Sequence, residues 1–250
     1  MWGIIPAAGA GSRIQPLGFS KELLPVGSRS EEGKQKPRAV AEYLVDRLFL
    51  AGVDKLCFVV APGKSDILEY FGAGRFTQHC VTFVVQPQSA GLCDAIFRPA
   101  PLISPEEVVM IGLPDTIWFP ADGLCKLPDD RLSFLLFPVE HPELFDVVRT
   151  DDLNTLIEIQ VKPCAPRSKW IWGAIKMPAL IFHELHALWK DRNQADEYIG
   201  TLINAWLAQG GEAKGYYLGK SYVDVGTING YHQAIQILKE NSAKEGRSIL

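Results

Sequence analysis

The stretch "IIPAAGAGSRIQPLGFSKELLPVG", residues 4–27, decides how the rest of the chain is interpreted. Its first residues belong to an apolar run that begins at residue 2 and is typical of a short buried strand. The loop that follows is made of small residues: Ala7, Ala8, Gly9, Ala10, Gly11 and Ser12. Their backbone N–H groups can approach an anion closely. Arg13 adds a forked donor for phosphate oxygens, and Lys21 adds a second cation. The loop is therefore predicted to bind a polyphosphate.

The loop matches neither of the two common glycine-rich phosphate motifs. A P-loop requires G-x-x-x-x-G-K-[ST], and a dinucleotide fingerprint requires G-x-G-x-x-G, whose third glycine is missing here. The missing glycine disfavours an NAD(P)-binding dehydrogenase. Taken alone, "GAGSR" is equally compatible with a tight turn, so the loop needs support from the rest of the chain.

Composition excludes several classes of protein. Hydrophobic residues make up 47% and charged residues 22% of the 250 residues, which is close to the average of globular domains. The net charge of −4 and the pI of about 5.8 do not favour nucleic-acid or anionic-membrane binding. No apolar run is long enough to span a membrane, and the N-terminus does not resemble a signal peptide. We therefore expect a soluble, cytoplasmic protein without nucleic-acid or membrane partners.

The cysteines support this expectation. Their number is odd and none lie in a C-x-x-C pair; they are Cys57, Cys80, Cys93, Cys125 and Cys164. Buried free thiols in a reducing compartment are the simplest interpretation.

Strand and helix patterns alternate over the first half of the chain. Strands are expected at 2–7, 55–62, 81–87 and 107–115, with helices at 37–52, 65–72 and 90–100. This alternation predicts βαβ units and a mostly parallel sheet that helices cover on both faces. In such sheets ligands bind beyond the carboxyl ends of the strands. The opening loop, Gln86 and Asp115 each follow such an end, so we expect them to converge on one crevice.

The second half of the chain is less regular. Strands are expected at 132–139, 156–163 and 169–178, helices at 179–191, 196–210 and 228–246, and a strand-rich segment at 213–227. We find no internal repeat and no interdomain linker, so we expect a single α/β, Rossmann-like domain over residues 1–250 with a mixed, mostly parallel sheet. The charged segment 28–38 is expected to be a solvated loop, with a mobile lid as the alternative.

The longer string around the opening loop resembles the signature of the sugar-1-phosphate nucleotidylyltransferases, the family that includes glucose-1-phosphate thymidylyltransferase. That signature runs Gly-x-Gly-[Thr/Ser]-Arg, then a Pro, then a Lys before a short apolar segment. Five later segments are similar to family segments in the same order: "VQPQSAGLCDAI" (85–96), "IGLPDTIW" (111–118), "VKP" (161–163), "DEYIGTLIN" (196–204) and "YVDVGT" (222–227). Together the six segments span residues 3 to about 235.

The resemblance implies a reaction and a division of the domain. The family joins an NTP to a sugar 1-phosphate and releases pyrophosphate, by in-line attack on the α-phosphorus without a protein nucleophile. Residues 1–120 would mainly bind the nucleotide, 121–227 would mainly bind the sugar phosphate, and 228–250 would form a C-terminal helix and tail. Catalysis would consist of positioning and charge neutralisation.

The resemblance also implies roles on the nucleotide side. Arg13 would hold the leaving pyrophosphate, and Lys21 would bridge phosphates near the α-phosphorus. Asp115 and Asp224 would bind Mg²⁺ together, since this hard cation favours carboxylate and phosphate oxygens. The alternatives are a salt-bridged surface lysine for Lys21 and turn or cap formation for the aspartates. Arg13, Lys21, Asp115 and Lys162 form the implied catalytic set.

Further roles follow for the base and the sugar. Gln86 would read the base edge, and Gly91 would leave room for the ring. Lys162 would neutralise the attacking phosphate, and Glu197 would accept hydrogen bonds from sugar hydroxyls unless it is only a helix N-terminal acid. Gly173 and Asp146 would complete the sugar-phosphate side.

The departures from the family pattern lie mainly on the acceptor side, meaning the part of the site that would bind the sugar 1-phosphate. The acidic residues that usually precede the sugar-phosphate lysine are absent from "IQVKP", and Asp146 stands where a glycine usually approaches the sugar. The chain also stops soon after the helix at 228–242. We therefore expect a monomer or homodimer. The changes around the sugar phosphate affect the identity of the sugar more than the type of reaction.

The expected substrates are a pyrimidine NTP, with dTTP or UTP first, and a hexose 1-phosphate. A cytidylyltransferase acting on a sugar phosphate or a phosphonate is the related alternative. A non-catalytic nucleotide- or sugar-phosphate-sensing module is the alternative of another class, which the full set of charged residues disfavours.

Two further patterns carry no predicted function. His183 and His186 are three residues apart, whereas H-E-x-x-H zinc sites require four, so they are expected to be surface histidines of an amphipathic helix. Trp170 and Trp172 alternate on a strand and are expected to pack in the core, with a place in the sugar pocket as the alternative.

Overall fold

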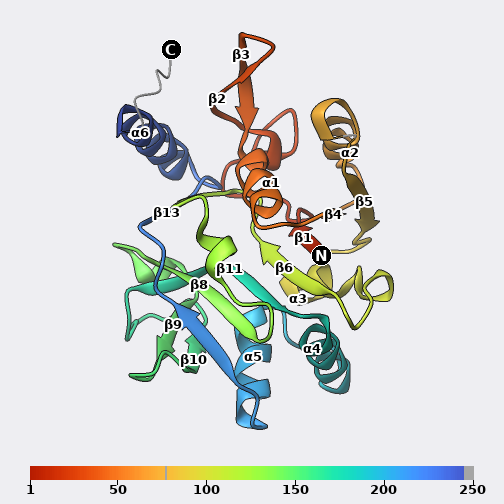
Figure 1. Cartoon of the computed structure of the whole chain (residues 1–250), viewed down its shortest axis with the longest axis vertical. Coiled ribbons are helices and arrows are strands. Elements are labelled where there is room, and N and C mark those ends of the chain that lie inside the picture. The colour runs from red at the N-terminus through yellow and green to blue at the C-terminus, as the bar shows by residue number, and fades with distance from the viewer. Residues whose placement is uncertain (77, 245–250) are drawn as a thin grey trace.

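The structure, a computed structural model, describes residues 1–76 and 78–244 (Figure 1). Its helices are α1 (Val40–Leu50), α2 (Ser65–Phe71), α3 (Gly91–Phe97), α4 (Ala179–Asp191), α5 (Ile199–Ala208) and α6 (Ile228–Lys244). Its strands are β1 (Trp2–Pro6), β2 (Pro25–Glu31), β3 (Lys34–Ala39), β4 (Lys55–Val60), β5 (Cys80–Val85), β6 (Val108–Gly112), β7 (Thr116–Phe119), β8 (Leu132–Pro138), β9 (Val147–Thr150), β10 (Leu156–Gln160), β11 (Trp170–Pro178), β12 (Ala213–Tyr216) and β13 (Ser221–Asp224).

The central sheet is mixed, as the sequence predicts. Its order is β10-β9-β11-β6-β1-β4-β5, and β8 adds to β11 and carries β12 at its other side. The pairs β6-β1, β1-β4 and β4-β5 are parallel, whereas β11 runs antiparallel to β6 and β8. The parallel strands carry the opening loop, the base segment and the Asp115 segment at one common edge.

Helices cover both faces of this sheet, which explains why its strands are continuously apolar. Neighbouring side chains of β1 point to opposite faces. Ile4 belongs to the core shared with α3, α4 and α5, and Ile5 belongs to the core shared with α1 and α2. Both side chains are fully buried. A strand buried on both faces cannot alternate polar and apolar residues.

The ends of α1 and α2 are stabilised in different ways. Helix α1 ends at Leu50, and Gly52 follows with a φ of 91°, the left-handed conformation that favours glycine. Helix α2 begins at Ser65 after the N-cap residue Lys64, whose ammonium group cannot accept a capping bond from the helix. Asp66 in the first turn of α2 accepts hydrogen bonds from Ser20 of the opening loop.

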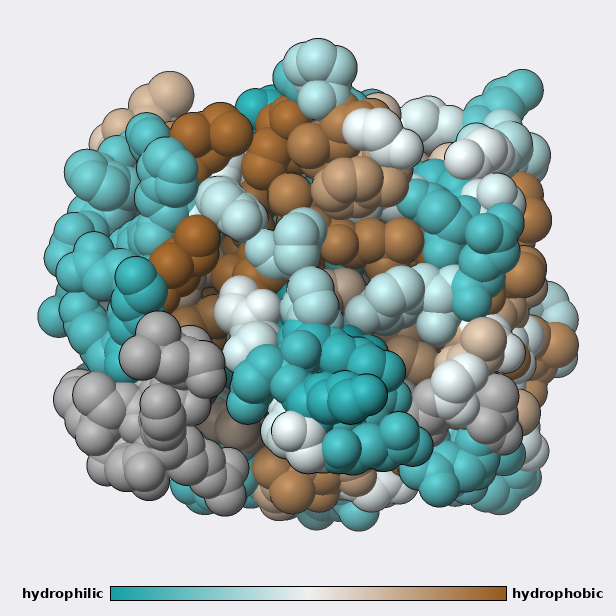
Figure 2. Space-filling model, turned by 90° about the horizontal axis from the view of Figure 1, so that it is seen from above, coloured by the Kyte–Doolittle hydropathy of each residue, from teal (hydrophilic) through white to brown (hydrophobic). Residues whose placement is uncertain are grey.

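Segment 28–38 is not a loop, contrary to expectation. It lies within a hairpin of β2 and β3 that extends from the body of the molecule beside α1 (Figure 1). The turn residues Glu32 and Gly33 have φ values of 50° and 76°, which is the conformation of a two-residue hairpin turn. Hydrophilic residues gather at the centre of the view from this end of the molecule (Figure 2). The charged composition therefore reflects an exposed hairpin.

A second small sheet went unrecognised in the sequence. Strand β7 follows Asp115 directly and pairs antiparallel with β13, so that Thr116 lies opposite Asp224. Arg47 of α1 donates to the backbone carbonyl of Trp118 and holds β7 against the helix. Both strands have four residues, which is too short for a clear periodic pattern.

The cysteines are only partly as expected. Cys57 and Cys93 are buried, but Cys80, Cys125 and Cys164 are exposed. Phe97, Phe134 and Phe137 are buried in the core. None of the described helices has the length and apolar character needed to cross a membrane.

Candidate active site

The opening loop, which runs from Ala7 to the short 3-10 helix Lys21–Leu23, leaves the sheet after β1 and closes around the stem of Lys21. The N–H of Ala7 donates to the carbonyl of Val59, and this is the last bond of the loop to β4. Gly9 and Ala10 are exposed. Gly11 has a φ of 68°, and a Cβ atom added there would lie 2.9 Å from Cδ of Lys21. Only glycine suits this position, because it provides both the conformation and the space.

Lys21 forms an ion pair with Asp115 at the centre of the crevice. The distance from Nζ to Oδ2 is 2.5 Å, and the two side chains are only 15% and 13% exposed. Burial by itself lowers the pKa of Lys21, but the charge and hydrogen bond of Asp115 outweigh it, so that the pKa is raised overall. Lys21 is therefore a permanent cation at this site.

Arg13 forms a second ion pair beside the first. Its Nη2 lies 3.0 Å from Oδ2 of Asp224, with 60% of the arginine side chain exposed. Asp224 is the last residue of β13, and Oδ1 of its carboxylate accepts the N–H of Gly226 at 2.7 Å. A largely exposed guanidinium next to a backbone-anchored carboxylate is suited to meeting a phosphate that enters from solvent.

The two aspartates converge on one point. A Cβ atom added to Gly226 would lie 2.8 Å from Oδ1 of Asp224, 3.3 Å from Oδ2 of Asp115 and 3.2 Å from Nη2 of Arg13. No group of three or more metal-binding side chains occurs among the described residues. This donor set fits Mg²⁺, which proteins usually hold by one or two carboxylates while the substrate phosphates supply further oxygens.

Tyr222 of β13 feels the charge of these carboxylates and of Asp146, and no sequence motif pointed to it. Burial raises the pKa of Tyr222 well above its ordinary value, and the carboxylates of Asp224, Asp115 and Asp146 raise it further. Three carboxylates therefore act on one buried phenol. A Cβ atom added to Gly173 would lie 2.5 Å from the Phe137 ring and 2.9 Å from the Tyr222 ring, so this glycine leaves room for both rings.

Lys162 and Asp146 lie together on the acceptor side. Lys162 follows β10 with a φ of 39°, and its Nζ lies 4.7 Å from the ring centroid of Tyr198. Burial raises the pKa of Asp146, and the charge of Lys162 offsets part of this rise. The departure at position 146 thus places a half-buried carboxyl group next to the lysine expected to bind the sugar phosphate.

The segment expected to read the base (85–96) and the segment expected to bind the sugar (196–204) contact each other directly. The carbonyl of Glu197 accepts the N–H groups of Leu92 and Cys93, at 2.7 and 3.2 Å, at the start of α3. Gly91 has a φ of 87°, and a Cβ atom added there would lie 2.7 Å from Cα of Glu197. The space beside Gly91 is thus taken by the Glu197 backbone. The Glu197 side chain itself is exposed.

Gln86 follows β5 and is held from within the chain. Its side-chain nitrogen donates to Oδ2 of Asp94 at 2.8 Å and to the carbonyl of Gly91 at 3.1 Å. Only 4% of Gln86 is exposed. These contacts fix the orientation of the amide that is expected to read the base edge.

The family model for nucleotidyl transferases matches residues 2–241, nearly the whole chain. The protein belongs to the nucleotidyl transferase family.

Individual relatives share only about a quarter of their residues with this chain. A glucose-1-phosphate thymidylyltransferase of Neisseria meningitidis is 26% identical over 96% of this chain and 83% of its own length. A UTP–glucose-1-phosphate uridylyltransferase of Haloferax volcanii is 25% identical over 98% and 99%. A Bacillus anthracis structure with bound sucrose, assigned as a glucose-1-phosphate thymidylyltransferase, superposes with a TM-score of 0.81 over 96% of each chain at 22% identity. This structural likeness confirms the fold.

In this nucleotidyl transferase the turn between β4 and α2 holds the opening loop in place, and no sequence motif indicated this contact. Lys64 and Asp66, in the connection between β4 and α2, contact Ala7, Ser20 and Glu22 of the loop. The available signal was the position of "GKSD" after a predicted strand, at the same edge of the sheet as the loop.

Proposed function

We propose that the protein transfers a nucleotidyl group from a pyrimidine NTP, dTTP or UTP, to a sugar 1-phosphate and releases pyrophosphate. The observation that carries this proposal is the pairing of Arg13 with Asp224 and of Lys21 with Asp115 around Gly226, beside the glycine-containing loop. Two cations and two carboxylates at one point suit a reaction whose substrates are all phosphates.

In the proposed reaction an oxygen of the sugar phosphate attacks the α-phosphorus of the NTP. A new P–O bond forms while the bond from the α-phosphorus to the bridging oxygen of the β-phosphate breaks. The bonding electrons leave with pyrophosphate. Because the attacking oxygen is already anionic, the chain has no need to supply a nucleophile or a general base.

The chain contributes position and charge to this step. The backbone N–H groups from Ala8 to Ser12 would bind the phosphates of the NTP. Exposed Arg13 would take the leaving pyrophosphate, and buried Lys21 would act at the α-phosphate. The two cations offset negative charge that would otherwise oppose the approach of two anions.

Asp115 and Asp224 would hold Mg²⁺, which when bound neutralises phosphate charge. In the structure each carboxylate meets one of the site's cations instead. Entry of the phosphates gives Arg13 and Lys21 new anionic partners. The carboxylates then become free to turn towards a cation.

The sugar phosphate would bind near Lys162 and Asp146, which lie together, with Gly173 and Glu197 as the further expected contacts. Lys162 would pair with the attacking phosphate, and Glu197 would accept hydrogen bonds from sugar hydroxyls. Asp146 would face the sugar as a group that either accepts or, when protonated, donates a hydrogen bond. The choice of sugar follows from these contacts.

Gln86 would read the base edge, and the relatives named above are described as a thymidylyltransferase and a UTP-dependent uridylyltransferase. Because Asp94 and Gly91 take both N–H donors of this amide, its oxygen would be left to accept the ring N–H of thymine or uracil. We further predict a monomer or homodimer located in the cytoplasm. Sedimentation velocity tests the oligomeric state.

A pyrophosphate-release screen with Mg²⁺ tests the proposal. Five NTPs are crossed with sugar 1-phosphates and phosphonates, and Asp115→Asn is compared with Asp122→Asn, whose carboxylate is half exposed and paired with Lys126. We expect release with dTTP or UTP and one sugar 1-phosphate, abolished in Asp115→Asn only. Release with CTP would identify a cytidylyltransferase. Nucleotide binding without release from any pair would instead indicate a sensor.

A further inference from the structure

We propose that Lys64 is a positioning residue for Lys21, because it ties together the two ends of the opening loop. The role rests on the proposed function of Lys21 in the transfer reaction. Lys64 lies in the turn between β4 and α2, more than forty residues from the loop in sequence.

The ammonium group of Lys64 is fully used by this connection. Its Nζ donates to the carbonyl of Ala7 at 2.7 Å and to both carboxylate oxygens of Glu22 at 2.9 Å. A lysine ammonium has three donors, and here it meets three acceptors. Ala7 begins the loop and Glu22 follows Lys21, so that one side chain fixes both ends of the loop.

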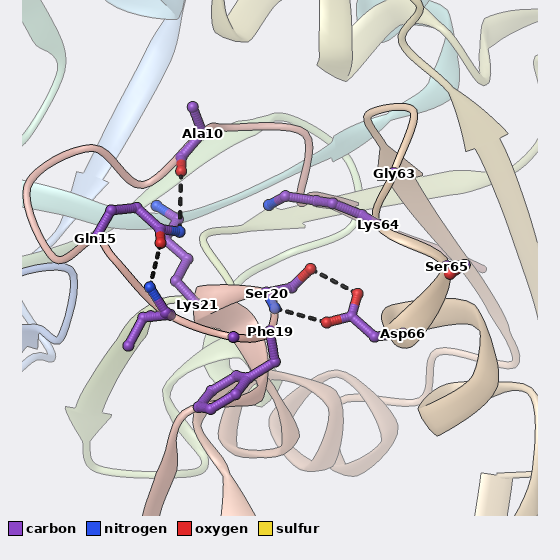
Figure 3. A pocket seen from close by; sticks show the side chains of 11 residues that line it. Ala10, Gln15, Phe19, Ser20, Lys21, Gly63, Lys64, Ser65 and Asp66 are labelled. Atoms are coloured by element: carbon purple, nitrogen blue, oxygen red, sulfur yellow. Dashed lines mark hydrogen bonds between the residues drawn. The ribbon is translucent and has the colours of Figure 1, made fainter.

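A second contact from the same turn holds the residue before Lys21. Asp66 accepts the N–H of Ser20 at 2.6 Å and the hydroxyl of Ser20 at 2.7 Å (Figure 3). Lys21 therefore lies between two anchored neighbours, Ser20 and Glu22. The turn fixes the backbone from which the Lys21 side chain extends towards Asp115.

The burial of the Lys64–Glu22 pair shows that it is more than a surface ion pair. The side chain of Glu22 is 1% exposed and that of Lys64 is 13% exposed. Burial raises the pKa of Glu22, and the charges of Lys64 and Lys21 offset only part of this rise. A buried ion pair adds little stability compared with apolar side chains of similar size. Fixing the position of the loop is therefore a better explanation for the Lys64–Glu22 pair than stability.

A cavity lies between the loop and the turn, beside Lys21. The cavity has a volume of about 390 Å³ and is lined by both segments, including Lys21, Gly18, Lys64 and Asp66 (Figure 3). Packing therefore does not fill the space between the loop and the turn. Hydrogen bonds at residues 7, 20 and 22 hold the loop instead.

Loss of the Lys64 bonds to Ala7 and Glu22 should slow catalysis, because Lys21 would no longer be held in position. A displacement of about 1 Å at a positioned group costs on the order of 100-fold in rate. Lys21 is proposed to act at the reacting phosphate, so kcat should fall more than the affinity for the NTP. A purely structural role would lower the Tm and leave kcat unchanged in the folded protein.

The test compares three variants of the full chain by pyrophosphate release under Mg²⁺. Lys64→Met alone would leave Glu22 buried without a partner and could prevent folding. The main variant is therefore Lys64→Met/Glu22→Leu, which replaces the pair with apolar side chains of similar size. Lys64→Arg preserves the charge, and Lys239→Met is the matched control on the exposed face of α6.

We expect the double variant to keep a Tm within a few degrees of the wild type but to lose about 10- to 100-fold in kcat, with a smaller change in KM for the NTP. Lys64→Arg should recover most of the rate, and the control should match the wild type. An unchanged kcat in the folded double variant would overturn the proposal.

A second readout needs no substrate and separates this proposal from the proposed function. Acetylation of Lys21 by an amine-reactive reagent is followed by mass spectrometry in the wild type and the double variant. Faster acetylation of Lys21 in the double variant supports the positioning role, and equal rates overturn it. If the wild type releases no pyrophosphate with any pair, the proposed function fails, while the acetylation rates still decide the role of Lys64.

Discussion

The backbone N–H of Val225 donates to the backbone carbonyl of Asp115 over 2.8 Å. This bond continues the pairing of β7 with β13 past the end of both strands. It places Asp224 beside Asp115 although more than a hundred residues separate them in the chain. The two carboxylates are therefore positioned by backbone hydrogen bonds and not by the flexible ends of side chains.

We expect Asp224→Asn to abolish most activity without unfolding the protein. The asparagine oxygen can still accept the N–H of Gly226, but the charge that faces Arg13 is lost. Removal of one preorganised charged group costs on the order of 100- to 1,000-fold in kcat. Steady-state pyrophosphate release and a Tm measurement check this. Wild-type kcat in this variant would exclude Asp224 from the site.

Gly11→Ala should impair catalysis more than Gly18→Ala. The first substitution meets a φ of 68° and a Cβ contact of 2.9 Å with Lys21, whereas nothing lies within 4 Å of a Cβ at Gly18. We expect Gly11→Ala to lose about 1 kcal/mol or more of stability, because alanine is strained at positive φ. Its kcat should also fall, since Lys21 must move. Equal behaviour of the two variants would show that the close approach has no functional effect.

Gly91→Ala tests whether the base and sugar segments act together. The new Cβ would lie 2.7 Å from Cα of Glu197 and 2.8 Å from its carbonyl oxygen, which accepts two N–H groups of α3. We expect KM to rise for both the NTP and the sugar 1-phosphate. Gly210→Ala is the matched control, because its φ of 94° is equally strained but its surroundings are open. A rise in only one KM would contradict the coupling.

His186 should make stability depend on pH. Burial lowers its pKa from 6.5 to about 4, with further effects of Lys190 and His183, and its ring stacks on Phe97. The unfolded chain therefore binds a proton at a higher pH than the folded chain does. The free energy of unfolding should be fully retained above pH 6.5 and fall as the pH drops towards about 4.

Thermal unfolding of His186→Gln between pH 7 and pH 4.5 checks this dependence, with exposed His232→Gln as the control. The His186 variant should lose less stability over this range than the wild type, and the His232 variant should follow the wild type. Parallel curves for all three proteins would show that burial does not shift the pKa of His186.

Long apolar patterns were predictable because burial on both faces of a sheet leaves a strong trace in the sequence. Strands β1, β4, β5 and β6 lie where periodicity placed them, with ends that differ by at most three residues. Strands β7 and β9 have four residues each and were not predicted. The hairpin of β2 and β3 was missed because its exposed strands carry charges, and exposed charge alone does not distinguish a hairpin from a loop.

The sequence by itself determined the fold class, the family resemblance and the identity of the charged residues around the opening loop. Those depend on residue type and on local order, both of which a chain records directly. The tertiary structure decided how the charges are paired. It brought Asp224 to Asp115 through β13, set Tyr222 among three carboxylates, and placed Lys64 against both ends of the loop. These contacts join distant segments, and the free energy that selects them comes from the packing of the whole sheet.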